Sequence, residues 1–426
     1  MAADAATFFE RFCHALESHD IPFVIIHSYE QLPEQMTSDI DFAVRCEDLP
    51  KLLAIQREVA ARQGWVLASV MQAKIFALYT VFFDPEDPSR FIQLDACGHY
   101  VELGRLVLRD TELLEGRRRF RFFQVPAPAV EFGYVLAKAL IKKKPLERRL
   151  SRLRALWESD PPAANAVFKK LAGDDVGRLD EWFSRPAEEW ERCLRRPLRS
   201  RNRIRGVNLM REALRAVKRT LRPAGLHLVI FGPDGAGKST LISRLDGLSV
   251  FRRQKQFHFR PCVFKRRSDT PVRQPHAQTP YSALFSLAKT FFYFADHWLG
   301  YWLRVFPAKV RNELVIFDRS FEDQVIDPRR YRLSGARGLA RCLKVLLPKS
   351  DLTFVLDADP DLLHARKPEL SLDELRRQRE ALRQLAATTR RSFVISAAQP
   401  PEEVERLVRQ RVIGFLAERE KHRYPA

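Results

Sequence analysis

The chain has 426 residues, and 46% of them are hydrophobic, so two or three domains with sizeable cores are expected. These values exclude intrinsic disorder, a collagen-like repeat and a disulfide scaffold, and the formal net charge of +20 favours an anionic partner. The six cysteines are scattered without a CxxC pair, and no secretory signal opens the sequence. A cytoplasmic protein with reduced thiols is therefore expected.

The positive charge is unevenly distributed along the sequence. Residues 1–190 carry 25 basic and 29 acidic side chains, residues 191–222 carry 12 and 2, and residues 223–426 carry 36 and 22. This asymmetry predicts separate domains with different partners. We place them at 1–128, at 129–222, which is a helical region with a basic linker, and at 223–426. Nucleotides, nucleic acid or a membrane surface are the partner classes expected for the last part.

The first 128 residues mix predicted helices and strands. Apolar spacing predicts helices over residues 7–18 and 49–63. Strands are predicted for the apolar runs at 22–26, 40–44, 65–70, 75–83 and 91–94. From residue 129 to about residue 198 the pattern is helical. The prediction is an α+β domain followed by a helical connector.

Three aspartates lie on two of the predicted strands. Asp39 and Asp41 open the second strand and share one of its faces, and Asp95 ends a later strand. Carboxylates grouped in this way hold Mg²⁺ for nucleotidyl transfer. The trio resembles the nucleotidyltransferase fold over residues 1 to about 145. The resemblance implies that these aspartates bind metal and that Lys138 or Lys142 approaches a triphosphate.

The turn after the first strand departs from that pattern. Nucleotidyltransferases usually have glycines there, whereas this chain has His27, Ser28 and Tyr29. Without glycine, close approach of the backbone to a phosphate is compromised. Two alternatives to an active nucleotidyltransferase therefore stay open: a degenerate, regulatory or acceptor-binding domain, and a chance pair of loop-capping aspartates.

Residues 195–222 form a strongly basic linker. Its second part is amphipathic, because apolar residues recur there at helical spacing. These residues are Val207, Met210, Leu214, Val217 and Leu221. A linker helix that packs this stripe and solvates its arginines is the first expectation, and peripheral membrane contact is the alternative. Nucleic-acid binding is disfavoured, because no recognition module surrounds the segment.

From residue 225 the predicted strands and helices alternate. Short apolar strands are predicted at 226–231, 313–317, 352–356 and 392–395. This order predicts a parallel sheet with helices on both faces. Residues 284–306 are long and aromatic, but Lys289, Asp296 and Arg304 interrupt them. Charges cost about 2.5–3.5 kcal/mol each near the centre of a membrane span, so a buried helix lining a cleft is expected instead.

The clearest motif is a glycine-rich turn between a predicted strand and a predicted helix. Residues 232–240 match G-x-x-x-x-G-K-[ST] without deviation. Glycines allow the backbone to wrap a phosphate with its N–H groups pointing inward, and the helix N-terminus favours an anion. Lys238 is expected to reach the β- and γ-phosphates, and Ser239 to ligate Mg²⁺. The nucleotide-binding set is Gly232, Asp234, Gly235, Ala236, Gly237, Lys238, Ser239 and Thr240.

A carboxylate at the end of another predicted strand accompanies the glycine-rich turn at residues 232–240, which we call the phosphate loop. Four apolar residues lead into Asp318, which is the form expected for a residue that holds Mg²⁺ or its water. Asp357 also ends a predicted strand, and we interpret it as structural.

The second half resembles the thymidylate kinase group of P-loop nucleoside monophosphate kinases, from residue 225 to about residue 415. The resemblance rests on the loop sequence Asp-Gly-Ala-Gly-Lys-Ser-Thr, on the Asp318–Arg319 pair and on the arginine-rich segment 366–383. It implies binding of ATP and Mg²⁺ and transfer of the γ-phosphoryl group to a small acceptor.

The same resemblance implies roles for single residues. Asp234 would face the sugar of the acceptor, Arg319 would grip its phosphate, and Arg260 would be a second phosphate arginine. Arg366 would belong to a lid that closes over the phosphates, with further arginines behind it. These are Arg376 and Arg379.

Several positions differ from thymidylate kinases. Phe231 replaces a usual glutamate and Ser320 a usual tyrosine, while residues 327–332 resemble kinase-like proteins of bacterial surface-polysaccharide gene clusters. We therefore expect a phosphotransferase acting on a nucleotide or on a phosphorylated sugar or glycolipid precursor. The alternatives are a P-loop NTPase switch or binding module, and a nucleotidyltransferase acting through the N-terminal aspartates.

Overall fold

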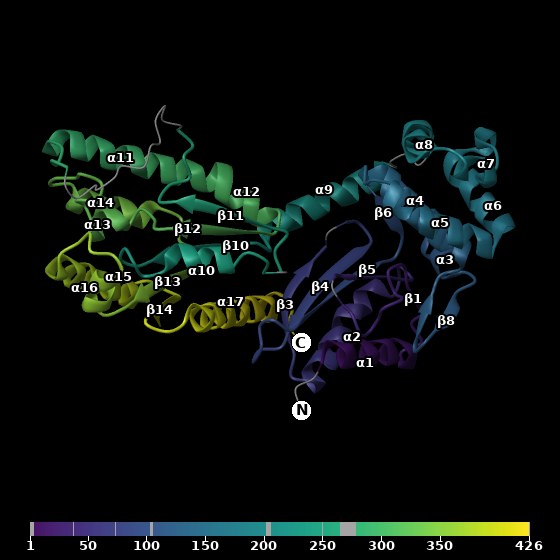
Figure 1. Ribbon diagram of the computed structural model, residues 1–426, viewed down its shortest axis with the longest axis horizontal. Coiled ribbons are helices and arrows are strands. Elements are labelled where there is room, and N and C mark those ends of the chain that lie inside the picture. Colours follow the sequence, from purple (N-terminus) through teal and green to yellow (C-terminus); the bar gives the residue numbers. More distant parts are fainter. Residues whose placement is uncertain are drawn as a thin grey trace. The chain divides into compact units, whose positions relative to one another are not determined.

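The computed structural model describes residues 4–36, 38–72, 74–102, 105–201, 206–248, 250–264 and 278–425. The chain divides into two compact units: unit 1 comprises Met1–Lys218 and Ile413–Ala426, and unit 2 comprises Arg219–Val412. Both units mix helices and strands, so the predicted α/β class is confirmed at this level (Figure 1). Part of the basic linker, residues 202–205, lies outside the described residues.

Unit 1 contains a five-stranded mixed sheet with the strand order β1-β2-β5-β4-β3. The strands are β1 (Phe23–Ile25), β2 (Ile40–Val44), β3 (Val66–Met71), β4 (Ala77–Phe83) and β5 (Phe91–Cys97). β2 and β5 are parallel, and the other neighbours are antiparallel. Because successive residues point to opposite faces, Phe23 and Ile25 share a core with α1 (Ala5–Ser18) and α2 (Leu49–Arg62). Val24 shares the opposite core with α4 (Pro128–Lys142).

Unit 1 also contains short elements that the sequence analysis did not predict. They are two hairpins, β6 (Tyr100–Glu102) with β7 (Arg105–Leu108) and β8 (Arg118–Phe120) with β9 (Phe123–Val125), and the helix α3 (Asp110–Leu114). Three- and four-residue strands are too short for an apolar pattern to be recognised.

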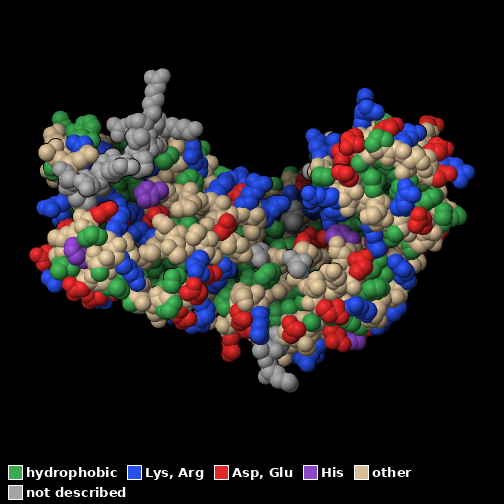
Figure 2. Space-filling view, viewed as in Figure 1, with side chains coloured by type: hydrophobic (Ala, Val, Ile, Leu, Met, Phe, Trp, Pro, Cys, Tyr) green, Lys and Arg blue, Asp and Glu red, His purple; other side chains and the backbone are tan. Residues whose placement is uncertain are grey.

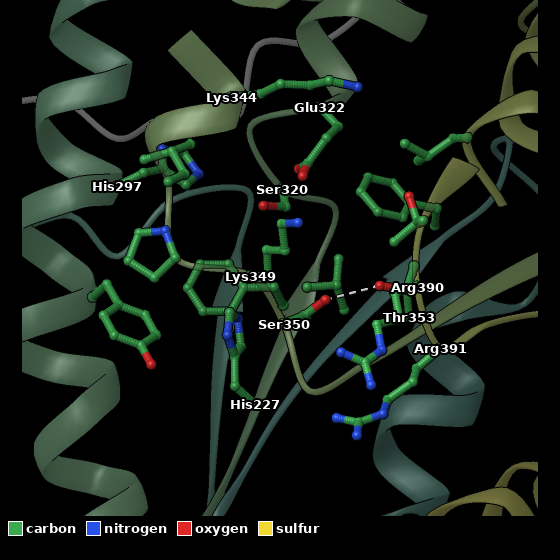
Figure 3. A pocket seen from close by; sticks show the side chains of 18 of the residues that line it. His227, His297, Ser320, Glu322, Lys344, Lys349, Ser350, Thr353, Arg390 and Arg391 are labelled. Atoms are coloured by element: carbon green, nitrogen blue, oxygen red, sulfur yellow. Dashed lines mark hydrogen bonds between the residues drawn. The ribbon is translucent and has the colours of Figure 1, made fainter. Parts of the chain in front are cut away.

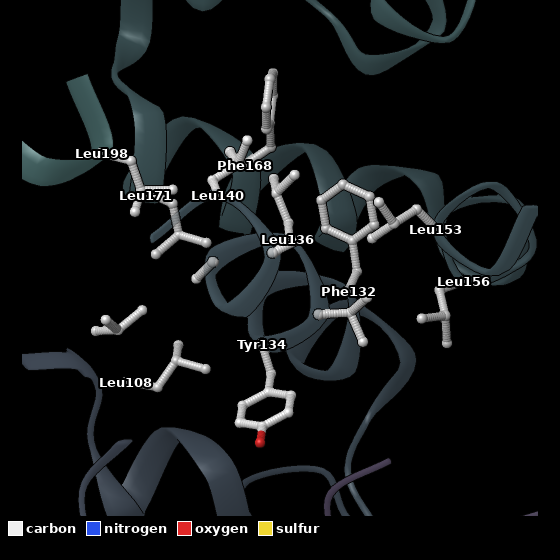
Figure 4. Close-up of a cluster of buried hydrophobic side chains, with 14 of the residues drawn as sticks. Leu108, Phe132, Tyr134, Leu136, Leu140, Leu153, Leu156, Phe168, Leu171 and Leu198 are labelled. Atoms are coloured by element: carbon white, nitrogen blue, oxygen red, sulfur yellow. The ribbon is translucent and has the colours of Figure 1, made fainter. Parts of the chain in front are cut away.

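The helices that follow the sheet share one core with it. They are α5 (Glu147–Ser159), α6 (Pro161–Ala172), the 3₁₀ turn η1 (Asp174–Val176), α7 (Leu179–Phe183) and α8 (Ala187–Arg201). α4 is buried around most of its circumference: Phe132, Leu136 and Leu140 face the other helices, and Tyr134 points to the opposite side (Figure 4). The predicted boundary at 128/129 therefore lies inside a compact unit, because α4 serves both parts.

Unit 2 contains a five-stranded sheet in which every strand is parallel to its neighbours. The order is β11-β12-β10-β13-β14, with β10 (Leu226–Phe231), β11 (Arg253–His258), β12 (Glu313–Asp318), β13 (Leu352–Asp357) and β14 (Ser392–Ser396). Four of these strands were predicted. β11 was missed, because it is a polar edge strand, Arg-Gln-Lys-Gln-Phe-His, without an apolar run.

Helices flank this parallel sheet, as the sequence predicted (Figure 1). They are α10 (Lys238–Arg244), α11 (Ala283–Gly300), the π-helical turn η3 (Tyr301–Val305), α12 (Phe306–Val310), α13 (Asp323–Ile326), α14 (Arg337–Leu343), the 3₁₀ turn η4 (Lys344–Leu346), α15 (Pro360–Arg366), α16 (Leu372–Thr388) and α17 (Pro401–Arg423). Val305, Ala308 and Leu382 place η3, α12 and α16 on the face that carries Val229 and Phe317. Ion pairs from Arg244 to Glu402 and Glu405 join α10 to α17.

The long aromatic helix α11 is oriented differently from the prediction. Its buried residues are polar or small, and include Ser286, Thr290, Asp296, His297 and Gly300. Its exposed face carries Leu284, Phe291 and Trp298, and hydrophobic side chains reach the surface at its beginning (Figure 2). The prediction of a buried helix is therefore wrong for the aromatic face. In the described part of the chain, no helix combines the length and the apolar character needed to cross a membrane.

The linker helix α9 (Gly206–Leu221) is also oriented differently from the first expectation. The five residues of the predicted packing stripe are each more than half exposed. Asn208 is the buried residue of this helix. The prediction that the apolar stripe packs against the protein is therefore wrong.

Candidate functional site

The phosphate loop lies at the carboxyl end of β10, the central strand of the unit 2 sheet. Gly235 and Gly237 have φ values of 84° and 83°, in the left-handed region that glycine adopts without strain. A Cβ at Gly232 would approach the carbonyl oxygen of Leu356 to 3.0 Å, whereas a Cβ at Gly237 would meet no atom within 4 Å. The loop is therefore tight against β13 and open beside Lys238, as a phosphate cradle requires.

Lys238 folds back over this loop. Its Nζ donates to the carbonyl oxygens of Gly232 and Pro233, both at 2.8 Å, and lies 4.0 Å from Asp234. Burial and the nearby charge of Arg319 lower the pKa of Lys238 to about 7. An ammonium group whose hydrogen bonds go to backbone carbonyls is poised to exchange them for phosphate oxygens, whose negative charge stabilises it more strongly.

Asp318 fits the role of a magnesium ligand. It ends β12 and pairs in register with Ile230 of β10, next to the loop. Its Oδ2 lies 3.2 Å from Nδ1 of His258, whereas its buried Oδ1 has no hydrogen-bond partner among the described residues. Burial opposes its ionisation, but the hydrogen bond with His258 and the charge of Lys238 keep the pKa of Asp318 below its usual range. An ionised carboxylate with one oxygen free of hydrogen bonds to the described residues is the donor type that Mg²⁺ prefers.

A cluster of charged residues surrounds Asp234. Arg319 Nη2 donates to Asp234 Oδ1 at 2.7 Å, and Arg330 Nη1 donates to Asp234 Oδ2 at 2.8 Å. Arg319 also donates to Asp323 at 3.2 Å, and the hydroxyl of Tyr331 donates to that carboxylate at 2.8 Å. Although burial opposes it, the two guanidinium groups hold the pKa of Asp234 well below its usual range.

This cluster changes the interpretation of Arg319. The side chain of Arg319 is 3% exposed and enclosed by carboxylates, whereas that of Arg330 is 20% exposed. The structure thus makes Arg330 the more accessible arginine beside Asp234. The sequence analysis missed Arg330 and His258, although Arg330 belongs to the unusual string 327–332.

The remaining predicted arginines have different surroundings. Arg260 contacts the buried Asp296 at 3.3 Å, and Asp296 in turn accepts from the backbone N–H groups of residues 262–264. Arg379 donates to Asp357 at 2.8 Å, which agrees with the structural interpretation of that aspartate. Arg376 pairs with Asp373 on the surface. These three arginines are not brought to the phosphate loop by any contact in the described residues.

Arg366 lies closer to the loop. It ends α15, and a Cβ on Gly235 would be 3.6 Å from the Cβ of Arg366 and 3.4 Å from that of Lys367. Its Nη1 donates to the carbonyl oxygen of Ala397 at 3.0 Å. The end of α15 therefore packs against the phosphate loop, while the guanidinium of Arg366 is bonded to a backbone carbonyl.

A cavity of about 380 Å³ lies on the sheet face that carries His227 and Phe317 (Figure 3). Ser320 and Glu322, which follow Arg319 in sequence, also line it. Neither ring nitrogen of the buried His227 has a hydrogen-bond partner in the part of the chain that the structure describes. Burial lowers the pKa of His227 to about 4, so its imidazole is neutral.

The structure brings together the three predicted aspartates of unit 1. Carboxylate oxygens of Asp39, Asp41 and Asp95 lie within 4.8 Å of one another, because Asp41 and Asp95 are register partners on the parallel strands β2 and β5. Burial and the charge of Asp41 raise the pKa of Asp95 to about 7. A divalent cation would relieve this repulsion between carboxylates, so the trio fits a metal site.

Lys138, rather than Lys142, reaches this centre. Lys138 Nζ donates to Asp41 Oδ2 at 3.0 Å, and His27 Nε2 lies 2.9 Å from the same oxygen. Lys142 pairs with Glu102 at 3.4 Å instead. The turn that lacks glycine has Ser28 in the left-handed region, with φ 59°. The turn therefore adopts a conformation that glycine would favour, and its histidine joins the aspartate centre.

A basic cavity of about 390 Å³ lies next to this turn. His27 and Ser28 line it together with Lys144, Arg148, Arg149 and Arg152. Arg152 is paired with Glu131 and Glu30 at 2.6 and 2.8 Å. Positive charge therefore gathers next to the carboxylates, as a site for an anionic substrate requires.

A second group of metal-ligand types, Cys46, His99 and Asp110, lies in unit 1. Asp110 accepts from the backbone N–H of Cys46 at 2.9 Å, and Nδ1 of His99 accepts from the backbone N–H of Asp110 at 3.1 Å. Burial raises the pKa of the Cys46 thiol to about 11. The Asp110 carboxylate and the His99 ring already accept hydrogen bonds from backbone N–H groups, and the Cys46 thiol is protonated. We therefore assign the group a structural role.

Comparison with known proteins adds no family to these observations. No protein-family model matches the chain, and a search of curated proteins finds no match. The function is therefore inferred from the residues and their geometry.

Proposed function

We propose that unit 2 is an ATP- and Mg²⁺-dependent phosphotransferase of the thymidylate kinase-like type. It transfers the γ-phosphoryl group of ATP to a nucleotide or to a phosphorylated sugar or glycolipid precursor. The observation that carries the proposal is the phosphate loop with Lys238 at the carboxyl end of the central strand, next to the Asp234 cluster. In open α/β sheets, ligands bind outside the carboxyl ends of the strands.

In this proposal the phosphate loop binds the phosphates of ATP. Gly235 and Gly237 let the backbone curve around the phosphates, and Lys238 exchanges its carbonyl partners for phosphate oxygens. Asp318 and Ser239 are the residues that would hold Mg²⁺, which neutralises charge on the β- and γ-phosphate oxygens when it is bound. Phosphoryl transfer needs little covalent help, so this positive environment supplies most of the catalysis.

The charged cluster around Asp234 binds the acceptor in this proposal. Arg319 is a positioning residue, because its buried guanidinium fixes Asp234 and Asp323. Arg330 is accessible enough to exchange part of its contact with Asp234 for an acceptor phosphate, which a guanidinium binds in bidentate fashion. Closure of the segment after Arg366 over the loop would exclude water and limit wasteful hydrolysis.

An acceptor screen distinguishes this proposal from a P-loop switch without a small acceptor. The full chain is incubated with Mg²⁺ and ATP labelled in its γ-phosphate, with single nucleoside monophosphates or sugar phosphates added. A kinase gives slow ATP turnover alone and faster turnover, with a labelled product, when its acceptor is present. Turnover that no acceptor stimulates, with all label released as inorganic phosphate, would contradict the kinase.

A second function is supported by the aspartate centre of unit 1. We propose that Asp39, Asp41 and Asp95 bind a divalent cation, with Lys138 and the basic cavity for an anionic substrate, as in a nucleotidyltransferase. Without the cation, burial and the charge of Asp41 raise the pKa of Asp95 to about 7. The two proposed activities use different residues, so each is open to a separate test.

Metal binding tests this second site directly. Titration calorimetry with Mn²⁺ is expected to show a site that the double variant Asp39→Asn/Asp95→Asn lacks, with unchanged phosphotransfer by unit 2. The matched control Asp84→Asn/Asp87→Asn alters aspartates of a surface turn and is expected to retain the site. Equal Mn²⁺ binding by the parent and the Asp39→Asn/Asp95→Asn variant would contradict the assignment.

A further inference from the structure

The helix α9 presents its apolar face to the outside of the protein. Val207, Met210, Leu214, Val217 and Leu221 are 54% to 76% exposed. They recur every three or four residues, so they form one continuous stripe along the helix. A helix that only connected two parts of a chain would bury such a stripe, because exposed apolar surface is unfavourable in water.

The opposite face of α9 is polar and contacts unit 1. Asn208 is buried, and Glu212 is paired with Arg215 at 2.6 Å. Arg215 also donates to the carbonyl oxygen of Gln72 at 3.3 Å. The polar side chains of α9 thus make its contacts with the rest of unit 1, and the apolar stripe lies on the opposite side of the helix.

Basic residues border the stripe on one side. At 100° per residue, Arg211 and Lys218 lie between the apolar face and the inner polar face, and Arg222 follows at the end of the helix. These three residues are exposed, and the guanidinium of Arg211 also lies over the ring of Phe76, 4.9 Å from its centroid. The single acidic residue of α9, Glu212, is paired on the inner side. The exposed surface of α9 is therefore apolar with a positive border.

We propose that α9 binds the surface of an anionic phospholipid bilayer and attaches the protein to it peripherally. The apolar stripe would enter the interface between headgroups and acyl chains, and Arg211, Lys218 and Arg222 would contact lipid phosphates. The positive border favours this occupant over an uncharged surface, and the apolar stripe favours it over nucleic acid. The proposal does not depend on the activity of unit 2.

Vesicle sedimentation with the full chain tests the proposal. The probes are vesicles of phosphatidylcholine and vesicles of equal parts phosphatidylcholine and phosphatidylglycerol, at about 0.15 M ionic strength. The parent is expected to bind the anionic vesicles about tenfold or more tightly than the neutral ones. Leu214→Glu/Val217→Glu is expected to lose this binding, and Arg211→Glu/Lys218→Glu to weaken it by about tenfold or more.

The control is Leu346→Glu, which changes an exposed apolar residue of η4 that does not line the cavity of Figure 3. This control is expected to bind as the parent does, and all variants are expected to keep the parent's circular dichroism and ATP turnover. Equal binding to neutral and anionic vesicles, or binding that survives Leu214→Glu/Val217→Glu, would overturn the proposal. A change from oligomer to monomer in Leu214→Glu/Val217→Glu without loss of vesicle binding would assign the stripe to a second copy instead.

Discussion

The arginines of unit 2 differ in what their guanidinium groups contact. Arg319 lies between two carboxylates and is almost completely buried, whereas Arg330 shares Asp234 and remains partly exposed. Removing one partner of a buried ion pair leaves an uncompensated charge and is strongly destabilising. Arg319 is therefore expected to matter for stability as well as activity, and we propose that Arg330 makes the direct contact with an acceptor phosphate.

Replacing Arg330 tests this assignment. Arg330→Ala is expected to lower kcat/KM for the acceptor by about 100-fold, because a bidentate contact between charged groups is lost. Arg330→Lys is expected to recover little, since an ammonium group cannot form the two parallel bonds. The neighbouring exposed residue gives the control Arg329→Ala, which should stay within about twofold of the parent, a small change for a surface site. Equal effects of Arg329→Ala and Arg330→Ala would contradict the role.

His227 makes the stability of the protein depend on pH. Its folded-state pKa of about 4 lies below the ordinary value for histidine, so the unfolded chain binds more protons between these values. Stability is therefore expected to fall as the pH is lowered from about 6.5 to about 4, by about 3 kcal/mol for this residue. His297 is also buried with a lowered pKa and acts in the same direction.

The variant His227→Phe isolates the contribution of this residue. The ring lies 5.1 Å from Phe317, and a phenyl group removes two buried nitrogens without partners in the described structure. We expect His227→Phe to be more stable than the parent by about 1–3 kcal/mol at neutral pH. Urea unfolding is then expected to depend less on pH below 6.5 than in the parent. An unchanged pH dependence would show that His227 is not the titrating group.

Among the helices and strands, those with a strong local pattern of apolar residues were predicted from the sequence. The strands β10, β12, β13 and β14 are apolar runs, and each was found close to its predicted position. β11 was missed, because an edge strand with polar residues lacks that pattern. The orientations of α9 and α11 were predicted wrongly, since hydrophobic spacing identifies an apolar face but not whether the protein itself covers it.

The same distinction applies to the candidate sites. The phosphate loop and the aspartate trio were predictable because strand geometry places their residues together. Arg330 was not predictable, because it reaches Asp234 only through packing of segments distant in sequence. His258 was missed together with its polar strand β11, on which it is the register partner of Asp318. His27 lies beside Asp41 because β1 and β2 are paired, but no pattern in the sequence indicated that its side chain contacts the carboxylate. Pairing of side chains, as for Arg260 and Asp296, depends on tertiary structure and leaves no pattern in the sequence.

The helix α4 has a central position in unit 1. It packs against the sheet and against the later helices, and Leu136 is fully buried between them. Leu136→Ala is expected to lower the free energy of unfolding of unit 1 by about 2–5 kcal/mol. Glu158→Ala, at an exposed position of the same unit, is expected to change its stability by less than about 0.5 kcal/mol. Urea denaturation of the full chain measures both, and similar losses in the two variants would contradict the central position of α4.

The whole molecule combines two units with different charge and different candidate chemistry. Unit 1 carries a carboxylate centre with a basic cavity beside it, and unit 2 carries the phosphate loop and most of the excess positive charge. Between them in sequence, α9 carries basic residues that neither site uses. We expect two anionic small-molecule substrates and one anionic surface, and these three functions are separable by mutation.

We propose that unit 2 transfers the γ-phosphoryl group of ATP through its phosphate loop. The most direct measurement is label transfer from γ-labelled ATP to the acceptor by the parent, by Lys238→Ala and by the exposed-lysine control Lys169→Ala. We predict that Lys238→Ala lowers transfer by about 100- to 1,000-fold, because the positive group facing the transferred phosphate is removed. Lys169→Ala should match the parent. Full transfer by a correctly folded Lys238→Ala protein would contradict the claim.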